Sequence, residues 1–161
     1  MINIVLIEPE IPANTGNIGR SCAATGSRLH LIEPLGFQIS DKHLKRAGLD
    51  YWDKFEMKVY PDLEDFFRQN QGQYVFASTK GKLKYTDIHY DKDCYIFFGK
   101  ETKGIDEQIL LKYYDLTVRI PMGRNIRSLN LSNSAAIILY EALRQNNFFD
   151  LETEGSLIPP S

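Results

Sequence analysis

Six short apolar runs constrain the fold of this chain more than any other feature of its sequence. Several are apolar at consecutive positions, as in IVLI at 4–7 and YIFF at 95–98. Such runs are typical of strands covered on both faces, and therefore of a parallel sheet that lies between two layers of helices. We expect strands at 2–7, 29–32, 55–60, 74–77, 94–98 and 116–120.

Helical patterns fall between these runs, at 14–25, 61–71, 105–114 and 132–146. The second begins with Pro61 and acidic residues, a common start signal, and the last has apolar residues at helical spacing. The alternation predicts an α/β fold with an open, mainly parallel six-stranded sheet flanked by helices. The 161 residues suit a single domain at 1–150, and we expect the polar segment 151–161 to be a flexible tail.

Charge and cysteine content narrow the functional classes. The net charge of −2 and the pI of about 5.9 argue against a nonspecific nucleic-acid binder, which usually carries a basic footprint. Cys22 and Cys94 lack metal-ligand spacing, and neither a membrane span nor a signal peptide is apparent. We therefore expect free thiols, no metal and a cytoplasmic location. Local basic clusters exist, although each is more often a solvated face than a binding site: Lys42 with His43, Lys45 and Arg46; Lys80 with Lys82 and Lys84; Arg119 with Arg124 and Arg127.

The first segment that suggests chemistry is NTGNIGR, which follows the first strand and a turn. Gly16 and Gly19 lie one helical turn apart, and the plain interpretation is a close helix–helix contact. The functional interpretation adds Asn14, Asn17 and Arg20 as polar groups near the start of the helix, which attracts phosphate; Asn17 and Arg20 are three residues apart and share a face. Both interpretations stay open, because GxxG alone is weak and is not the GxGxxG dinucleotide fingerprint.

The second and third segments also follow strands. In FGKETKG, Gly99 either makes a turn or lets a ligand approach the backbone, and Glu101 is held at the edge of the sheet. In IPMGRNIRSLNLSNSAA at 120–136, Pro121 ends a strand, and five hydroxyl or amide side chains surround a helix start. Asn130 or Ser132 could simply cap that helix. One cap needs only one such residue, which favours a ligand-binding loop.

Together the three segments resemble the SPOUT class of S-adenosylmethionine-dependent RNA methyltransferases over nearly the whole chain. The opening IVLIEPEIPANTGNIGR and the stretch KRAGLDYW at 45–52 are most similar to the minimal branch, the tRNA (cytidine/uridine-34-2′-O)-methyltransferases. The resemblance implies a deep C-terminal trefoil knot and a homodimer whose active site is shared between subunits. It also implies S-adenosyl-L-methionine as cofactor and the tRNA anticodon stem-loop as substrate, methylated on the ribose of nucleotide 34.

The resemblance further assigns roles to individual residues. It places the cofactor against backbone at the ends of three strands, at Ala77 or Ser78, at Gly99 with Glu101 close by, and at Ile120, Met122, Ser128, Leu129 and Asn130. Arg20 matches the arginine to which the key catalytic role is assigned. Because a guanidinium has a pKa above about 12, we expect it to hold phosphate or stabilise the developing alkoxide rather than accept a proton. Asn17 would orient the ribose or phosphate, and Tyr140 would act at the dimer interface unless it is a core aromatic.

Substrate RNA would have to be bound by the bare domain. The candidate residues are Lys45, Arg46, Arg124 and Arg127, and the unstacked bases of an anticodon loop would suit stacking on Tyr51 and Trp52. Two alternatives remain: the same fold acting on ribosomal RNA or another tRNA position, and a non-catalytic protein that binds RNA or a nucleotide. A nicotinamide enzyme is disfavoured because GxGxxG is absent.

Overall fold

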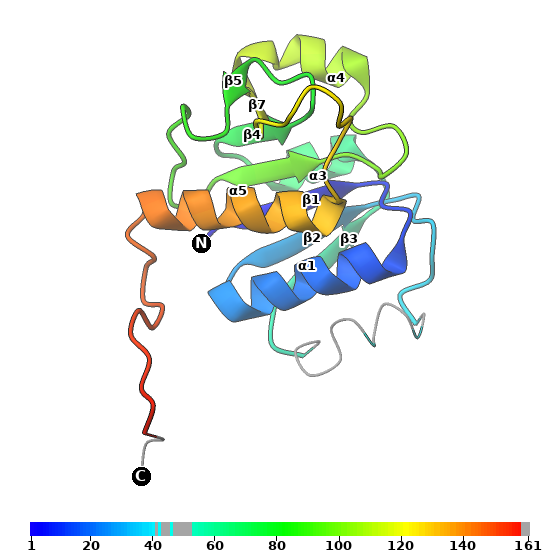
Figure 1. Cartoon of the computed structure of the whole chain (residues 1–161). Helices are drawn as coiled ribbons and strands as arrows, with labels where there is room; N and C mark the ends of the chain where they lie inside the picture. Colours follow the sequence, from blue (N-terminus) through cyan, green and yellow to red (C-terminus); the bar gives the residue numbers. More distant parts are fainter. Residues whose placement is uncertain (41, 43–45, 47–52, 159–161) are drawn as a thin grey trace.

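The computed structural model describes residues 1–40, 42, 46 and 53–158. Each predicted strand and helix is present, with its ends shifted by a few residues (Figure 1). No helix in this part of the chain is long and apolar enough to span a bilayer. In chain order the elements are β1 (Asn3–Ile7), α1 (Pro12–Thr25), β2 (Arg28–Ile32), β3 (Met57–Tyr60), α3 (Leu63–Gln69), β4 (Tyr74–Ala77), β5 (Leu83–Lys84), β6 (Tyr95–Phe98), α4 (Glu107–Lys112), a 3-10 turn (Tyr114–Leu116), β7 (Thr117–Arg119) and α5 (Leu131–Gln145).

The strands that the structure describes form one seven-stranded sheet in the order β3-β2-β1-β6-β4-β7-β5. Every neighbouring pair is parallel; Ile4, for example, lies opposite both Leu29 and Ile96. The prediction of six strands was wrong, because β5 at the edge is only two residues long. Leu83 pairs with Val118, and so short a strand depends on this tertiary partner rather than on an apolar run of its own.

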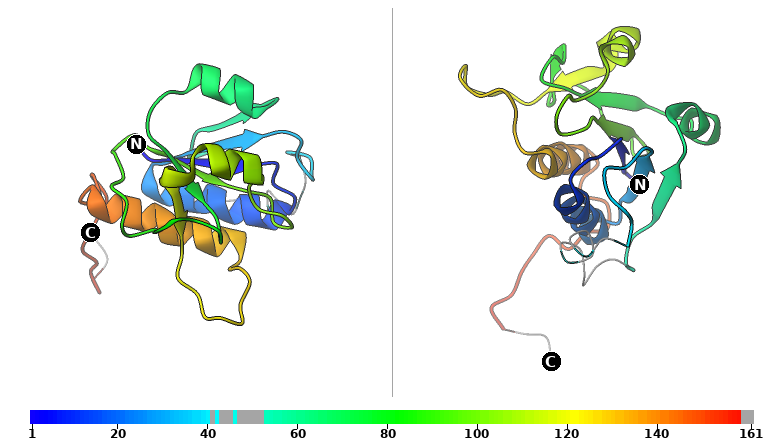
Figure 2. Two further views of the ribbon diagram at one scale, coloured as in Figure 1. Left: turned by 90° about the horizontal axis from the view of Figure 1, so that it is seen from above. Right: turned by 90° about the vertical axis from the view of Figure 1, so that its right-hand side faces the viewer.

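Helices cover both faces of the sheet, α1 and α5 on one side and α3 and α4 on the other (Figures 1 and 2). Consecutive side chains of β1 enter two different cores. Ile4 and Leu6 pack with Ile18 of α1 and with α5, whereas Val5 packs with Phe66 of α3 on the opposite face. The consecutive apolar residues of the strands therefore reflect burial on both faces, as the sequence predicted.

Helix ends follow local sequence signals. Pro12 occupies the first turn of α1, and Gly26 ends that helix in a left-handed conformation with φ 64 while its N–H donates to the Cys22 carbonyl. The Asp62 side chain caps α3 by accepting from the Asp65 N–H at 2.7 Å. Side chains cap α3 and α5, whereas α1 starts without a side-chain cap.

Candidate active site

A cavity of about 1020 Å³ opens where β1, β6, β4 and β7 end at their carboxyl edge. Ligands of open α/β sheets bind at this edge, outside the ends of the strands. Segments that lie far apart in sequence meet there, because parallel strands bring their C-terminal loops together. All nine residues predicted to bind the cofactor line this one cavity: Ala77, Ser78, Gly99, Glu101, Ile120, Met122, Ser128, Leu129 and Asn130.

Glu101 connects the loop after β6 to the start of α1. Its carboxylate accepts hydrogen bonds from the backbone N–H groups of Glu10, at 3.0 Å, and Ile11. Glu10 reciprocates by accepting from the N–H and hydroxyl of Thr102 at 3.0 and 2.7 Å, and these bonds lower the pKa of Glu10. Glu101 thus holds the backbone of the two residues that lead into α1, including its N-cap residue Ile11. It was predicted as a cofactor contact, and the geometry gives it this structural role in addition.

Two asparagines extend this connection to the third segment. Asn14 of α1 donates to Glu101 at 3.5 Å and accepts from the Asn130 side chain at 3.2 Å. The side-chain Oδ1 of Asn130 accepts from the backbone N–H groups of Ser132 and Asn133, at 2.9 and 3.2 Å, and so caps α5. Of the two possible caps, the structure therefore selects Asn130. Asn14 was one of the polar residues in the functional interpretation of the first segment, but it was assigned no role of its own; its buried position between the other two segments depends on the tertiary fold.

Gly99 is required by close backbone packing. A Cβ at this position would lie 2.0 Å from the carbonyl carbon of Gly104. The Gly104 N–H donates to the Lys100 carbonyl at 2.8 Å, and Gly104 itself has a left-handed φ of 69. The loop FGKETKG is therefore a tight turn that folds back on the end of β6. The turn interpretation of Gly99 is confirmed, and because this turn also lines the cavity, approach of a ligand to its backbone stays a prediction.

Glu8 is a cavity residue that sequence reasoning missed. It follows β1 directly, and its backbone is left-handed, with φ 53, which is uncommon for a residue with a long side chain. Its side chain lines the cavity, with a carboxylate oxygen 3.9 Å from Lys100 Nζ. The only sequence signal was its position at the end of a buried strand.

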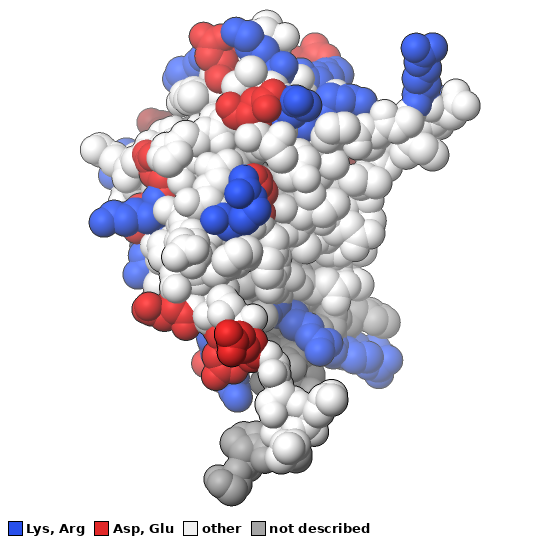
Figure 3. Space-filling view, turned by 60° about the vertical axis from the view of Figure 1, so that its left-hand side comes forward, with Lys and Arg blue, Asp and Glu red and all other residues white. Residues whose placement is uncertain are grey.

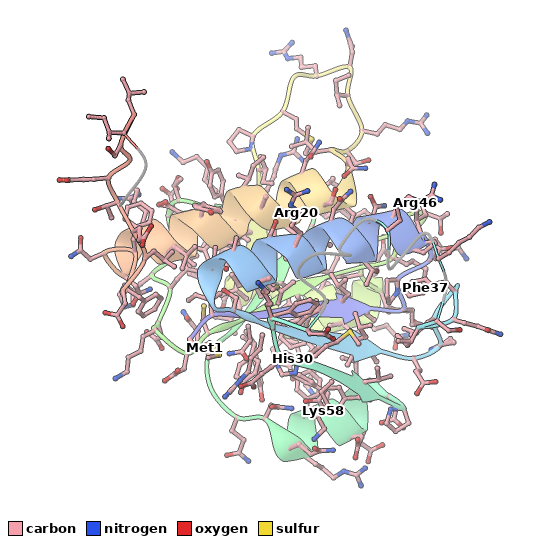
Figure 4. All side chains as sticks on the ribbon, turned by 90° about the horizontal axis from the view of Figure 1, so that it is seen from below. Met1, Arg20, His30, Phe37, Arg46 and Lys58 are labelled. Carbon is pink, nitrogen blue, oxygen red and sulfur yellow. The ribbon has the colours of Figure 1, made fainter. Side chains whose placement is uncertain are left out.

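The predicted catalytic residues lie apart from the cavity within one chain. Asn17 and Arg20 are exposed on α1, and Figure 4 shows Arg20 on the side of α1 that faces away from the sheet. Tyr140 on α5 is 47% exposed, so it is not a core aromatic. Helix α1 does lie against α5, as the plain interpretation of the glycines predicted, but Gly19 itself packs on the Phe55 ring in the segment before β3, where a Cβ would lie 2.8 Å away.

The basic clusters differ in how their charges are used. Each lysine of the second cluster pairs with an acid: Lys80 with Glu107, Lys82 with Asp115 and Lys84 with Asp87. Paired charges on an edge strand such as β5 are a usual protection against edge-to-edge association.

Arg124 and Arg127 are exposed on the loop between β7 and α5, which stands away from the body of the protein (Figure 2). Arg46 is exposed, whereas Lys45, Tyr51 and Trp52 lie outside the described residues. Within the described ranges, no group of three or more His, Cys, Asp or Glu side chains is arranged to hold a metal ion.

Comparisons with known proteins agree with this arrangement. Residues 1–140 match the SpoU rRNA methylase family. A relative from Methylovorus glucosotrophus, named tRNA (cytidine(34)-2′-O)-methyltransferase, is 50% identical over 150 residues, which cover 92% of this chain and 97% of that protein.

Two solved structures are also similar. One, from work on the 2′-OH methylation of C/U34 on tRNA, has a TM-score of 0.87 and 40% identity, covering 91% of this chain and 97% of that chain. The other is the SpoU methyltransferase AviRb from Streptomyces viridochromogenes in complex with AdoMet, with a TM-score of 0.78 and 27% identity, covering 90% of this chain and 57% of that one.

Proposed function

Because the chain belongs to the SpoU methylase family, we propose that it transfers a methyl group from S-adenosyl-L-methionine to a tRNA ribose. The acceptor is the 2′-hydroxyl of the wobble nucleotide 34, a cytidine or modified uridine. The observation that carries this proposal is the meeting of three sequence segments at one cavity, where the Glu101–Asn14–Asn130 hydrogen bonds join them. The activity named for the relative that is 50% identical supplies the substrate.

The cavity suits a nucleoside-sized cofactor. Its volume lies near the upper end of the range of about 300–1,000 Å³ that is usual for ligand pockets. Apolar side chains such as Ile120 and Ile138 provide walls for an adenine ring, and hydroxyl and amide groups such as Ser128 and Asn130 provide polar contacts. The cofactor supplies an activated methyl group, and the chain orients the acceptor oxygen and handles its proton. We propose that the loop after β7 and α5 form a trefoil knot around this site.

We propose a homodimer, because Arg20 and Asn17 are exposed on α1 and do not line the cavity of their own chain. Large apolar side chains are exposed at the start of α1 and on α5, the two helices that cover the same face of the sheet, including Ile11, Ile137 and Tyr140. Figure 3 shows a broad, mostly uncharged area with lysines and arginines around its edges. Burial of this surface against a second copy would bring α1 of one protomer to the cavity of the other. Arg20 would then hold a substrate phosphate and stabilise the negative charge that develops on the ribose oxygen.

RNA binding in this proposal uses the exposed arginines of the loop between β7 and α5. Arg124 and Arg127 reach beyond the cavity rim, and Lys45 and Arg46 remain candidates on a second segment. Contacts to phosphates release counterions, so affinity for the anticodon stem-loop should fall steeply as the salt concentration rises. We place the enzyme in the cytoplasm, with its tRNA substrate.

Methyl transfer to a synthetic anticodon stem-loop tests this function. Labelled S-adenosyl-L-methionine should label a stem-loop with C34 but not one with 2′-deoxy-C34, because the acceptor hydroxyl is then missing. Arg20→Ala should lower the rate at least about 100-fold, the usual effect of removing one charge-stabilising donor, without weakening cofactor binding. Lys82→Ala serves as a matched control, since Lys82 precedes the edge strand β5, is paired with Asp115 and does not line the cavity. Equal activity of Arg20→Ala, or labelling of the 2′-deoxy stem-loop, would contradict the proposal.

A further inference from the structure

Methylation of a hydroxyl releases a proton, and the site must provide an acceptor for it. Arg20 is unsuited to this, because a guanidinium remains protonated in proteins. The two described histidines are also remote from the cavity. His30 is buried between Asn3 and Tyr60, and His89 is exposed beside Asp91. The acceptor should therefore be sought among the carboxylates that line the cavity.

Four carboxylates line the cavity, and three of them already hold the structure together. Each of the three has at least one carboxylate oxygen engaged by a neighbouring group within hydrogen-bond distance. Glu101 accepts from the backbone of Glu10 and Ile11, Asp106 caps α4 by accepting from Gln108 N–H at 2.8 Å, and Glu107 pairs with Lys80. Protonation of any of them would break a contact that positions a loop or a helix.

The fourth carboxylate, Glu8, is placed differently. Among the described residues its carboxylate has one charged neighbour, Lys100, and their separation of 3.9 Å is too long for a hydrogen bond. The side chain is 35% exposed, and it retains room to accept a proton. The backbone N–H of Glu8 still donates to the Ile32 carbonyl at 2.9 Å, which ties the residue to the end of the sheet.

The backbone of Glu8 supports a functional role. A left-handed conformation costs a residue with a Cβ roughly 1–2 kcal/mol, and such strain concentrates at functional sites. Here φ is 53, and the conformation directs the chain after β1 so that Glu8 faces the cavity beside the turn of FGKETKG. Glycine or asparagine would avoid this strain, so the presence of glutamate calls for a reason that concerns the side chain.

We infer that Glu8 is the proton acceptor of the methyl transfer, an inference that rests on the proposed function. A bond forms between the 2′-oxygen and the methyl carbon while the bond from that carbon to sulfur breaks, and its electron pair stays on sulfur. The hydroxyl proton passes to the Glu8 carboxylate and is later released to water. Lys100 Nζ lies 3.9 Å from the Glu8 carboxylate, and the other charged groups on the adjoining loops are Glu10, Glu101 and Lys103.

Glu8→Gln tests this inference, with Glu33→Gln as the matched control. Glu33 follows the neighbouring strand β2, is exposed and does not line the cavity. A general base contributes about 10²–10⁴ in rate, so Glu8→Gln should reduce kcat at least about 100-fold. Its dissociation constants for S-adenosyl-L-methionine and for the stem-loop, and its unfolding midpoint, should match those of the wild type. The fall in rate on the acid side of the pH profile should disappear in Glu8→Gln and persist in Glu33→Gln.

The outcomes separate this inference from the proposed function. If the wild type methylates the stem-loop and Glu8→Gln retains more than half of its rate, Glu8 is not the acceptor and the function stands. If Glu8→Gln loses activity together with a tenfold weaker affinity for the cofactor, Glu8 has a structural role and the inference fails. If the wild type transfers no methyl group to any RNA, the proposed function fails first.

Discussion

The hydrogen bonds of Asn130 make the linkage between the three site segments directly measurable. Asn130 caps α5 through Ser132 and Asn133 and donates to Asn14, so Asn130→Ala removes two kinds of interaction. Loss of a cap costs about 1 kcal/mol and loss of a net hydrogen bond about 1 kcal/mol. We therefore expect Asn130→Ala to lower the free energy of unfolding by about 2 kcal/mol, or the Tm by about 4–8 °C for a chain of this size.

A second substitution separates the two contributions. Aspartate still accepts from the N–H groups at the start of α5 but cannot donate to Asn14, so Asn130→Asp should lose only about 1 kcal/mol. Asn133→Ala is the control, because that exposed side chain makes none of these bonds. Urea unfolding at constant protein concentration, with unchanged m values, provides the measurement. The reasoning is refuted if Asn130→Ala is as stable as the wild type, or if Asn130→Asp loses as much as Asn130→Ala.

Three further predictions concern the core, the turn and the dimer. Burial, with smaller effects of Arg28 and Lys58, lowers the pKa of His30 from 6.5 to about 4. Between pH 6.5 and pH 4 the unfolded chain therefore binds more protons at His30 than the folded chain does. The contribution of His30 to the free energy of unfolding is fully present above pH 6.5, and it falls by about 3 kcal/mol on acidification to pH 4. Urea unfolding of His30→Gln should not show this fall. Gly99→Ala should cost about 1–3 kcal/mol in thermal unfolding and weaken cofactor binding, whereas Gly123→Ala, with open space around its Cβ, should cost nothing. Ile137→Asp should give monomers in sedimentation, while Leu111→Asp, equally apolar and more exposed but on α4, should not.

The layers of the fold were predictable from local patterns, whereas the seventh strand was not. Runs such as 4–7 and 95–98 are apolar on both faces, and this pattern requires helices on both sides of a parallel sheet. Strand β5 has only Leu83 and Lys84, and the lysines at 80, 82 and 84 alternate with Gly81 and Leu83, so the segment resembles a basic patch. The fold brings Lys80 to Glu107 and Lys82 to Asp115, which no local pattern indicates, whereas Lys84 pairs locally with Asp87.

The sequence predicted which residues line the cavity more accurately than it predicted the contacts that their side chains make. Motif spacing identified Glu101 and Asn130, but both use their side chains to hold neighbouring backbone, at α1 and α5. The Glu101 contact joins residues 90 positions apart and the Asn130–Asn14 hydrogen bond joins residues 116 positions apart, so local patterns do not reveal either. The Asn130 cap of α5 is local, and it was one of the two caps that the sequence predicted. Glu8 was missed because its orientation depends on a left-handed backbone conformation, which the sequence EPE at 8–10 does not predict.

Mapping of ribose methylation in tRNA tests the central claim most directly. Total tRNA lacking 2′-O-methylation at nucleotide 34 would be incubated with the purified protein and S-adenosyl-L-methionine, and the methylated ribose would be located by nuclease digestion and mass spectrometry. We predict one new 2′-O-methyl group, at nucleotide 34 of tRNAs that carry cytidine or a modified uridine there. A methyl group at another position, or only on ribosomal RNA added in parallel, would contradict the wobble assignment.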